Sequence, residues 1–451
     1  MLGYYLKLAV RSFRRDIGLA ALMVIVLGFG IGASMTVLTT LRAIGGDPIP
    51  DKSSKLFVPQ IDVWGPQSRV GRAGGGPGRG FDSGSELPDR LTYRDAMALM
   101  QAHQAIRQTA MYGISLDVTQ PDGVPFSVTG RAAYADFFQM FEVPLASGRA
   151  WSRDEDQQQA NVVVLSTALA GRLFPHTNAV GKTVSLEGQQ YRIIGVIAPW
   201  NPVPRYYDLT VGSGFRDSEE LFLPFSTAID HQMTLNGKLS CLSRPASGWE
   251  GRLNSECLWI EFWAELPNSA AVQDYRRFLY NYAAEQRQLG RFHWPPLVEL
   301  HDVHDWLALE IKVPNTLRVS AVVAFGFLAV CLINAIGLLL ARFAGRAAEL
   351  GVRRALGASR RDIFLQCLAE TGIAGLLGGI IGLALTAAGL AGQRALHNVN
   401  GGVAAVSQLT SLSWGVVLIT LVVAVSATVC AGLYPGWRAS RVQPGWQLKV
   451  Q

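Results

Sequence analysis

Four long uncharged apolar runs divide the chain. They cover residues 17–41, 319–341, 371–393 and 413–434. Each is long enough to cross the roughly 30 Å hydrocarbon core of a bilayer, for which a helix needs about 20 residues. The first run is also longer than the roughly 7–15 residues of a signal-peptide core, and no small-residue cleavage site follows it. We therefore predict four transmembrane helices, the first an uncleaved anchor rather than a signal peptide.

Basic residues lie beside these runs and indicate how the chain is oriented. Lys and Arg are concentrated in three segments, 7–15, 342–361 and 438–449. The segment 394–412 has only Arg394 and His397 as basic residues. Because short loops rich in Lys and Arg stay in the cytoplasm, we expect both termini and residues 342–370 inside the cell. Residues 42–318 are then outside.

The long outside region has the alternating and periodic patterns of a mixed α+β domain. Strands are predicted at 55–63, 161–165 and 258–264, and hairpins at 114–119 with 125–129 and at 183–186 with 191–197. Helices are predicted to begin at the capping pattern 92–95 and to cover 134–140, 167–174 and 269–286. Residues 71–80 read as a mobile glycine-rich loop and 200–256 as an insertion with long loops.

These patterns give a complete order of segments. They are a cytoplasmic arm 1–16, helix and stalk 17–44, a periplasmic core domain 45–301, stalk and helix 302–341, a cytoplasmic coupling segment 342–370, a helix 371–393, a short outer loop 394–412, a helix 413–437 and a cytoplasmic tail 438–451.

Composition agrees with a membrane protein. Hydrophobic residues make up 49% of the chain and charged residues 16%, below the soluble norm of about 25%. The net charge of +6 sits beside the apolar runs, so it favours membrane topology and lipid contact over nucleic-acid binding.

Cysteine positions leave one question open. Cys331, Cys367 and Cys430 lie in or beside apolar segments, where cysteine usually acts as a packing residue. Cys241 and Cys257 lie in the outside region and can pair in an oxidising compartment. Spacing alone does not establish the connectivity, so both the paired and the free state stay open.

Motifs for catalysis or metal binding are weak. Residues 180–183 look like the tail of a phosphate-binding loop, but His176 stands where the motif requires glycine. His301 and His304 have carboxylate neighbours but no second ligand cluster. We see no triad and no paired carboxylates in a recognisable site. We therefore expect a non-catalytic chain that holds no metal and no cofactor itself.

Small and polar residues mark helix packing. Gly28 and Gly32 are four residues apart on the first helix, and Gly375 and Gly379 on the third, a spacing that permits close helix contact. Such contact can be within the subunit or across a dimer. Asn334 is the strongly polar residue of the second run and is expected to bond to a neighbouring helix. The runs contain no acid or base, so a proton relay has no carrier in them.

The segment 349–363 is the most basic short stretch of the chain. Helix formers fill it up to Leu356, Gly357 interrupts, and Ser359 with Asp362 permits a new helix start. A short basic helix between membrane spans has two interpretations. It can anchor to anionic lipid, or it can be the part that a cytoplasmic motor grips.

Residues 334–363, with the letters LLLARFAGRAAELGVRRALGASRRDI, resemble the FtsX-like permease segment of MacB-type (type VII) ABC transporters. The ending AGLYPGWRASRVQP at 431–444 is similar to that family's ending, and patches between 128 and 196 are similar to the MacB periplasmic core. The resemblance covers about two-thirds of the chain. No ATPase domain precedes the first helix, and 200–256 does not match clearly.

The resemblance implies a mechanism. It places the ATPase-coupling helix on Glu349, Gly351, Val352, Arg353, Arg354, Ala355, Leu356, Gly357, Ala358 and Ser359. It further implies a dimer of separate ATPase subunits that bind ATP and Mg, a second permease copy, like or paralogous, and a Gram-negative inner membrane. Export with a periplasmic membrane-fusion protein and an outer-membrane channel is the expected function, with motion rather than a substrate channel passing through the spans.

Two rival functions stay open. The same machinery serves lipoprotein release or FtsX-like control of a cell-wall hydrolase. A protein of another class, a membrane-anchored sensor or scaffold without a motor, would share the helix layout but associate with no ATPase.

Overall fold

The computed structural model describes residues 17–65, 87–119, 123–209, 214, 218–311, 315–399 and 414–441. The chain forms two compact units, one made of residues 1–45 with 313–451 and the other of 46–312. The predicted fold class, four apolar helices with a mixed α/β domain between the first and second, is confirmed. The arm 1–16, the loop 71–80 and the tail from 442 lie outside the described residues.

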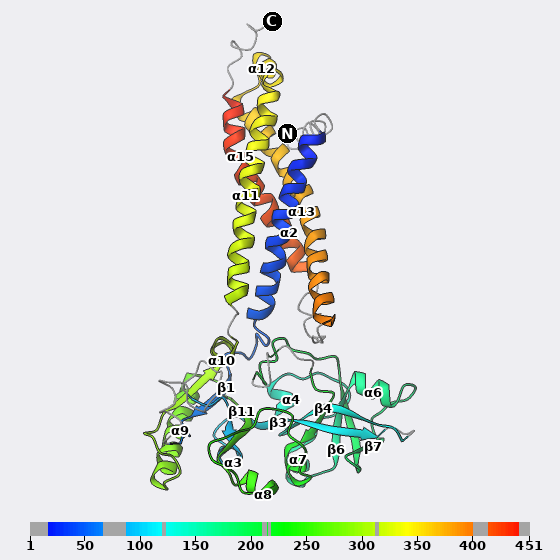
Figure 1. Ribbon diagram of the computed structural model, residues 1–451, viewed down its shortest axis with the longest axis vertical. Coiled ribbons are helices and arrows are strands. Elements are labelled where there is room, and N and C mark those ends of the chain that lie inside the picture. Colours follow the sequence, from blue (N-terminus) through cyan, green and yellow to red (C-terminus); the bar gives the residue numbers. More distant parts are fainter. Residues whose placement is uncertain are drawn as a thin grey trace. The chain divides into compact units, whose positions relative to one another are not determined.

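Among the described residues, the first unit contains four long helices and one short helix. They are α2 (Ile17–Gly45), α11 (Asn315–Gly345), α12 (Ala347–Ala355), α13 (Arg360–Val399) and α15 (Trp414–Ser440). In Figure 1, α13 packs against α2 and α15, and α11 packs against the same two helices. The helices extend beyond the predicted runs because polar residues continue the helical hydrogen bonding at their ends. Thus α13 is helical through 394–399, which we predicted as loop.

One large sheet organises the second unit. Its strands are β1 (Leu56–Ile61), β2 (Leu91–Thr92), β3 (Arg107–Thr119), β4 (Pro125–Ala133), β5 (Leu145–Gly148), β6 (Val162–Ser166), β7 (Thr183–Leu186), β8 (Gln189–Ile197), β9 (Leu221–Pro224), β10 (Ser240–Cys241), β11 (Cys257–Glu265) and β12 (Val298–Asp302). The main order is β12-β1-β11-β3-β4-β9-β6-β8-β5. The predicted hairpins are confirmed, with Thr119 opposite Pro125 and Leu186 opposite Gln189.

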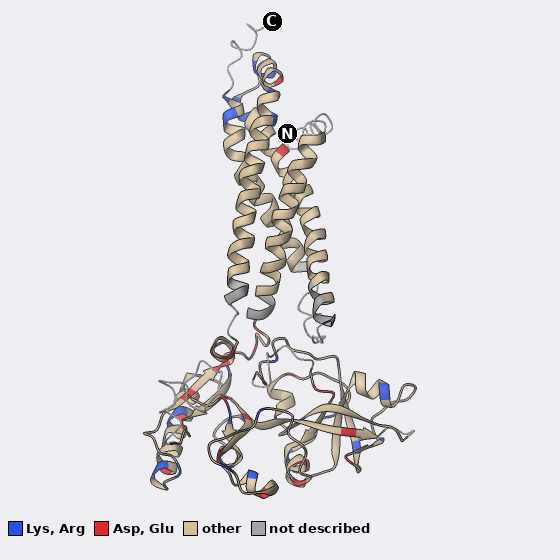
Figure 2. Ribbon diagram, in the orientation of Figure 1, with Lys and Arg blue, Asp and Glu red and all other residues tan. Residues whose placement is uncertain are grey.

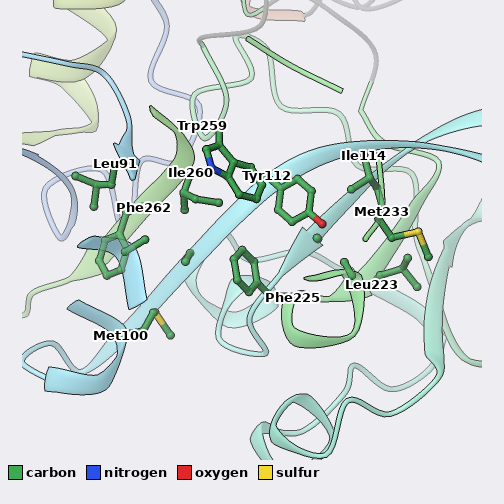
Figure 3. Close-up of a cluster of buried hydrophobic side chains, with 14 of the residues drawn as sticks. Leu91, Met100, Tyr112, Ile114, Leu223, Phe225, Met233, Trp259, Ile260 and Phe262 are labelled. Carbon is green, nitrogen blue, oxygen red and sulfur yellow. The ribbon is translucent and has the colours of Figure 1, made fainter. Parts of the chain in front are cut away.

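Both faces of the sheet are covered, because successive side chains of a strand point to opposite faces. In β11, Phe262 belongs to one core cluster and Trp263 to the other. Figure 3 shows the first cluster, in which Tyr112 of β3 lies between Trp259 and Phe225. Burial on both faces explains why β11 reads as a nearly continuous apolar run.

Short helices cover the sheet. They are α3 (Tyr93–Ala102), α4 (Phe137–Met140), α5 (Arg153–Gln157), α6 (Thr167–Leu173), α7 (Phe225–Asp230), α8 (Gly248–Leu253), α9 (Ser269–Gln288) and α10 (Val303–Glu310). The predicted start of α3 is confirmed, since the Thr92 hydroxyl accepts a hydrogen bond from the Asp95 N–H at 3.1 Å. The helix predicted over 134–140 begins only at Phe137. The stalk predicted over 302–316 is helical over α10 and again from Asn315, and 312–314 lie outside the described residues.

The prediction that 200–256 is an insertion is wrong, although its long loops are confirmed, since its described residues form helix or strand only at 221–230, 240–241 and 248–253. Strand β9 from this region lies inside the sheet, between β4 and β6. All four residues of β9 are buried, so the strand lacks the alternation of apolar and polar positions from which strands are predicted. The Pro, Gly and Ser residues around it indicated a loop instead.

The same region supplies the charges that neutralise a buried arginine. Arg131 of β4 is 0% exposed. Its guanidinium donates to Glu219 and to Glu261 at 2.6 Å each, and to Asp208. Asp208 and Glu219 both come from 200–256, so this segment is part of the core of the sheet domain and supplies two of the three carboxylates around Arg131.

Candidate functional site

The short helix α12 is a separate element between two long helices. It ends at Ala355, and Gly357 then adopts a φ of +103°, a left-handed conformation that glycine tolerates best. Ser359 and Asp362 form reciprocal bonds at the start of α13, from the Asp362 N–H to the Ser359 hydroxyl at 3.2 Å and from the Ser359 N–H to the Asp362 carboxylate at 3.0 Å. The interruption and restart predicted for this segment are confirmed.

A buried carboxylate holds α12 against α13. Glu370 is 2% exposed and accepts hydrogen bonds from Arg346 at 3.0 Å and from the Gln366 amide at 3.3 Å. Arg353 of α12 donates to Gln366 at 2.9 Å and to Glu349 at 2.8 Å. We call these five residues the α12 clamp. Charged hydrogen bonds of this kind are about twice as strong as neutral ones, so the clamp fixes α12 to the first turns of α13.

Apolar packing supports the clamp. Leu350, on the inner side of α12, is buried in the cluster that contains Phe343 of α11 and Ile363 of α13. The helix is thus fixed by one apolar and several ionic contacts to the ends of two long helices.

The opposite side of α12 is not covered by any of the residues that the structure describes. Leu356 is 83% exposed and Val352 is 52% exposed, and Ala355 and Gly357 are also exposed. Large apolar side chains on a short exposed helix are typical of a surface that another protein covers.

The charged side chains that the structure describes in the bundle lie at the end that carries α12. Figure 2 marks Lys and Arg positions on the ribbon of α12 and the neighbouring end of α15, whereas the middle of the described helices is uncharged. The exposed Arg360 and Arg361 begin α13 beside the apolar surface. This end can therefore attract a partner with an acidic rim.

The ten residues predicted for coupling divide into two groups. The buried or partly buried residues are Glu349, Gly351, Arg353, Arg354 and Ala358, whereas Val352, Ala355, Leu356, Gly357 and Ser359 are exposed. The sequence interpretation missed Arg346, Gln366 and Glu370. We ended the cytoplasmic segment at residue 370 and assigned no role to Glu370, although a lone carboxylate at the start of an apolar run was a signal for a buried partner.

The packing glycines make contacts within the bundle. A Cβ on Gly28 would lie 2.6 Å from Ile381, and one on Gly32 would lie 2.7 Å from Leu385, both on α13. A Cβ on Gly379 would lie 2.9 Å from Ala424 of α15, and one on Gly375 would meet Thr428. Of the two alternatives, these four positions serve contact within the subunit.

The expectation for Asn334 is wrong. Its side chain is exposed and has no hydrogen-bond partner among the described residues. It shares the outward side of α11 with Ile333, which is 66% exposed, whereas Cys331 and Ala335 face the bundle.

The remaining motifs take structural positions. Cys241 and Cys257 are joined in a disulfide between β10 and β11. Residues 180–182 form a turn into β7, and Lys182 lies over the Phe174 ring. His301 contacts Glu299 and Gln60 at 3.0 Å, and His304 lies 3.2 Å from Asp47, so the two imidazoles have different partners.

Two sequence families match the chain. The family of the MacB-like periplasmic core domain matches residues 20–273, and the FtsX-like permease C-terminal family matches 321–444. The first match runs through 200–256, the segment in which we saw no clear resemblance. Together they confirm the resemblance drawn from the basic segment, the ending and the core patches.

Individual relatives are distant. The chain is 24% identical over 388 residues to the macrolide export ATP-binding/permease protein MacB of Azoarcus sp. strain BH72, covering 84% of this chain and 50% of that protein. The protein of the same name from Chlorobium luteolum is 24% identical over 464 residues, and the match covers 98% of this chain and 58% of that protein. The chain therefore spans about half the length of the curated relatives it matches.

Two solved structures are also similar to part of the chain. The periplasmic region of MacB from Actinobacillus actinomycetemcomitans is 15% identical with a TM-score of 0.34, covering 56% of this chain and 92% of that one. The extracellular domain of the noncanonic ABC-type transporter YknZ from Gram-positive bacteria is 12% identical, with a TM-score of 0.34. The match covers 54% of this chain and 99% of that chain.

Proposed function

Since this chain belongs to the MacB-like periplasmic core domain family and carries an FtsX-like permease domain, we propose that it transmits ATP-driven motion in an ABC transporter. A separate ATPase subunit pushes α12, the clamp passes the movement to α13, and the bundle passes it to the sheet domain. The observation that supports this proposal most directly is the two-sided α12, held inside by Glu370 and bare outside at Leu356.

The apolar bundle favours motion over conduction. Within the described parts of the four spans, Arg342 and Glu370 are the buried ionisable groups besides cysteine, and both lie toward the α12 end. A proton relay would need ionisable groups at mid-depth, whereas the buried hydroxyls of Ser34, Thr386 and Thr428 donate to backbone carbonyls. The spans thus suit the role of rigid levers.

The orientation follows from charge and redox chemistry. We propose that the basic α12 end faces the cytoplasm, that both termini lie there, and that residues 46–312 are periplasmic. The disulfide between Cys241 and Cys257 supports an oxidising compartment for the sheet domain.

We propose these partners: an ATPase dimer that binds ATP and Mg, a second permease, like or paralogous, a periplasmic membrane-fusion protein and an outer-membrane channel. Relatives named for macrolide export make export the first candidate activity. Lipoprotein release or hydrolase control remains the second candidate for the same machinery. Mass spectrometry of proteins that co-purify in mild detergent separates them, because a fusion protein indicates export and a hydrolase indicates regulation.

The coupling role is tested at Leu356. Leu356→Asp should abolish co-purification of the ATPase and its stimulated ATP hydrolysis, because a carboxylate replaces the apolar contact. Leu289→Asp is the matched control, since Leu289 is a 71% exposed leucine in the other unit. Membrane insertion of both variants is checked by fractionation. Wild-type ATPase binding and hydrolysis in the Leu356→Asp complex would refute the proposed contact.

A further inference from the structure

A groove on the surface of the bundle shares no residue with the α12 clamp. It lies between the start of α13 and the last turns of α15 and measures about 510 Å³. The side chains that line it are Phe364 of α13 and Leu433, Tyr434 and Trp437 of α15. All four belong to the same compact unit, so the sheet domain takes no part in the groove.

The lining of the groove is apolar and exposed. Leu433 is 45% exposed, Tyr434 is 53% exposed and Trp437 is 47% exposed. Large apolar side chains that are exposed together mark a surface that something else covers. On a helix long and apolar enough to span a membrane, such a surface suits the hydrocarbon chain of a lipid.

Gly436 lets the two helices approach closely beneath the groove. A Cβ on Gly436 would lie 3.3 Å from the Cβ of Cys367 and 3.5 Å from the Phe364 ring. Because α13 begins and α15 ends here, one end of the groove opens where the bundle stops. Leu433 comes about one turn before Trp437, so it lies farther from that end.

Arg441 lies at the end of the groove where α15 stops. Its guanidinium carbon is 4.0 Å from the centre of the Trp437 ring, and Trp437 is stacked on Tyr434 with centroids 6.4 Å apart. A guanidinium that stacks on a ring uses its flat face, and its N–H edge stays available to a phosphate. The aromatic pair thus presents Arg441 as a donor to an anion.

The positive charge at this end is not neutralised within the part of the chain that the structure describes. Arg441 and Arg361 are exposed, and neither forms an ion pair there. Arg361 comes about one turn before the residue of α13 that lines the groove. The nearby carboxylates of Asp362 and Glu370 already take part in the start of α13 and in the α12 clamp. The end of the groove is therefore complementary in charge to a phosphate.

The order of side chains along α15 is typical of a helix that leaves a membrane. The apolar Leu433 is followed by the aromatic Tyr434 and Trp437 and then by Arg441. Tyrosine and tryptophan are enriched at the level of the lipid head groups, and arginine extends its charge toward the phosphates. The groove is thus apolar where hydrocarbon would lie and positive where head groups would lie.

We propose that this groove binds an anionic phospholipid. The phosphate accepts hydrogen bonds from Arg441, Arg361 supplies a second positive charge, and an acyl chain lies along Leu433 and Phe364. A zwitterionic lipid brings an ammonium group that these arginines repel, so a lipid of net negative charge is preferred. Lipid binding needs no ATPase, so the inference goes beyond transmission of motion and is tested separately from it.

The test uses the purified full chain in neutral detergent micelles and native mass spectrometry. The probes are dioleoylphosphatidylglycerol and dioleoylphosphatidylcholine, which have the same acyl chains and differ in net charge. We expect the phosphatidylglycerol adduct to form at about tenfold lower lipid concentration than the phosphatidylcholine adduct. An excess of glycerol phosphate should not displace it, because this soluble phosphate has no acyl chain to occupy the groove.

Two exposed arginines about one turn apart at the end of α15 give a matched pair of variants. Arg441→Gln should weaken phosphatidylglycerol binding about fivefold, because one basic residue near the phosphates contributes about that factor. Arg438→Gln makes the same change in charge, but Arg438 lines a different groove, between α11 and α15, so this variant should bind like the wild type.

A further variant tests the aromatic support. Trp437→Leu keeps the groove apolar but removes the ring beneath Arg441, so it should also weaken phosphatidylglycerol binding, and gel filtration of each variant reports on folding. The proposal is overturned if the wild type binds the two lipids equally, if glycerol phosphate displaces phosphatidylglycerol, or if Arg441→Gln and Arg438→Gln bind phosphatidylglycerol equally.

Discussion

At the scale of single residues, buried charge decides the stability of the sheet domain. Arg131 is enclosed by carboxylates from three segments, at sequence separations of 77, 88 and 130 residues. Removing one member of a buried ionic group leaves the others unpaired in a poorly solvating interior, which costs more than the pair itself contributed.

Arg131→Met should therefore lower the free energy of unfolding of the sheet domain by about 3–5 kcal/mol. Urea unfolding of the full chain, followed by tryptophan fluorescence, measures the change. Arg153→Met is the control, because the Arg153 guanidinium is 63% exposed and its pair with Asp136 should contribute no more than about 1 kcal/mol. Equal losses in the two variants would show that the buried cluster has no special role.

Asp156 should make stability depend on pH. Burial raises the pKa of Asp156 from its ordinary 3.8 to about 7, although N–H groups of Ala135, Ser226 and Phe225 and the Trp151 indole lower it. A raised native pKa stabilises the fold below the unfolded value, and this contribution is lost as pH rises through 7. Between pH 5 and pH 8 the loss is about 2–3 kcal/mol.

Asp156→Asn removes this titration, so the variant should lose less stability than the wild type over the same pH range. Urea midpoints at pH 5 and pH 8 give the stability of each protein. Asp154→Asn, at an exposed neighbouring position on α5, is the control. Parallel pH curves for the wild type and Asp156→Asn would contradict the assignment.

At the scale of elements, α12 is the part whose position the rest of the bundle determines. It has only nine residues, too few for a helix to be stable alone in water. Its stability comes from Leu350 and from the α12 clamp. Glu370 is the centre of this clamp because it meets both Arg346 and Gln366.

Glu370→Gln should loosen α12, since Arg346 loses the charge that it meets at 3.0 Å. Trypsin should then cut at Arg353 and Arg354 several-fold faster in the purified chain, and mass spectrometry of the fragments identifies the sites. Glu285→Gln, an exposed position on α9, is the control. Unchanged cleavage at α12 in Glu370→Gln would mean that apolar packing alone holds the helix.

At the scale of the whole molecule, topology connects the two units. The four spans, the charges at the α12 end and the disulfide all favour a sheet domain outside the cytoplasm. The proposed lever requires this arrangement, because motion that starts at α12 must cross the bilayer to have an effect.

Protease treatment of intact spheroplasts should degrade residues 46–312 and leave α12 uncut. A C-terminal tag should remain on a protected fragment that begins near α11. Permeabilised spheroplasts are the control and should lose α12 as well. Protection of the sheet domain in intact spheroplasts would overturn the orientation and, with it, the proposed function.

Local patterns were sufficient for much of the fold. The four spans, both hairpins and the start of α3 at Thr92 follow from apolar length, alternation and capping, which depend on neighbours in the sequence. The two strongest failures, β9 and Asn334, have a common cause. Whether a short apolar strand is central, or which side of a helix faces the bundle, depends on elements far away in the chain.

The candidate site shows the same division. The segment 349–359 stands out by charge and by Gly357, so its place as a distinct basic helix was predictable. Its clamp was not, because Arg346 and Glu370 are 24 residues apart and only the antiparallel return of α13 brings them together.

The amino-acid sequence by itself determined that four of the described helices are long and apolar enough to span a membrane and that a mixed domain lies between the first two, because the hydrophobic length of a span is a local property. Only the tertiary structure decided which carboxylates surround Arg131 and which residues hold α12. These features depend on contacts between distant segments, and such contacts exist only after the chain has folded.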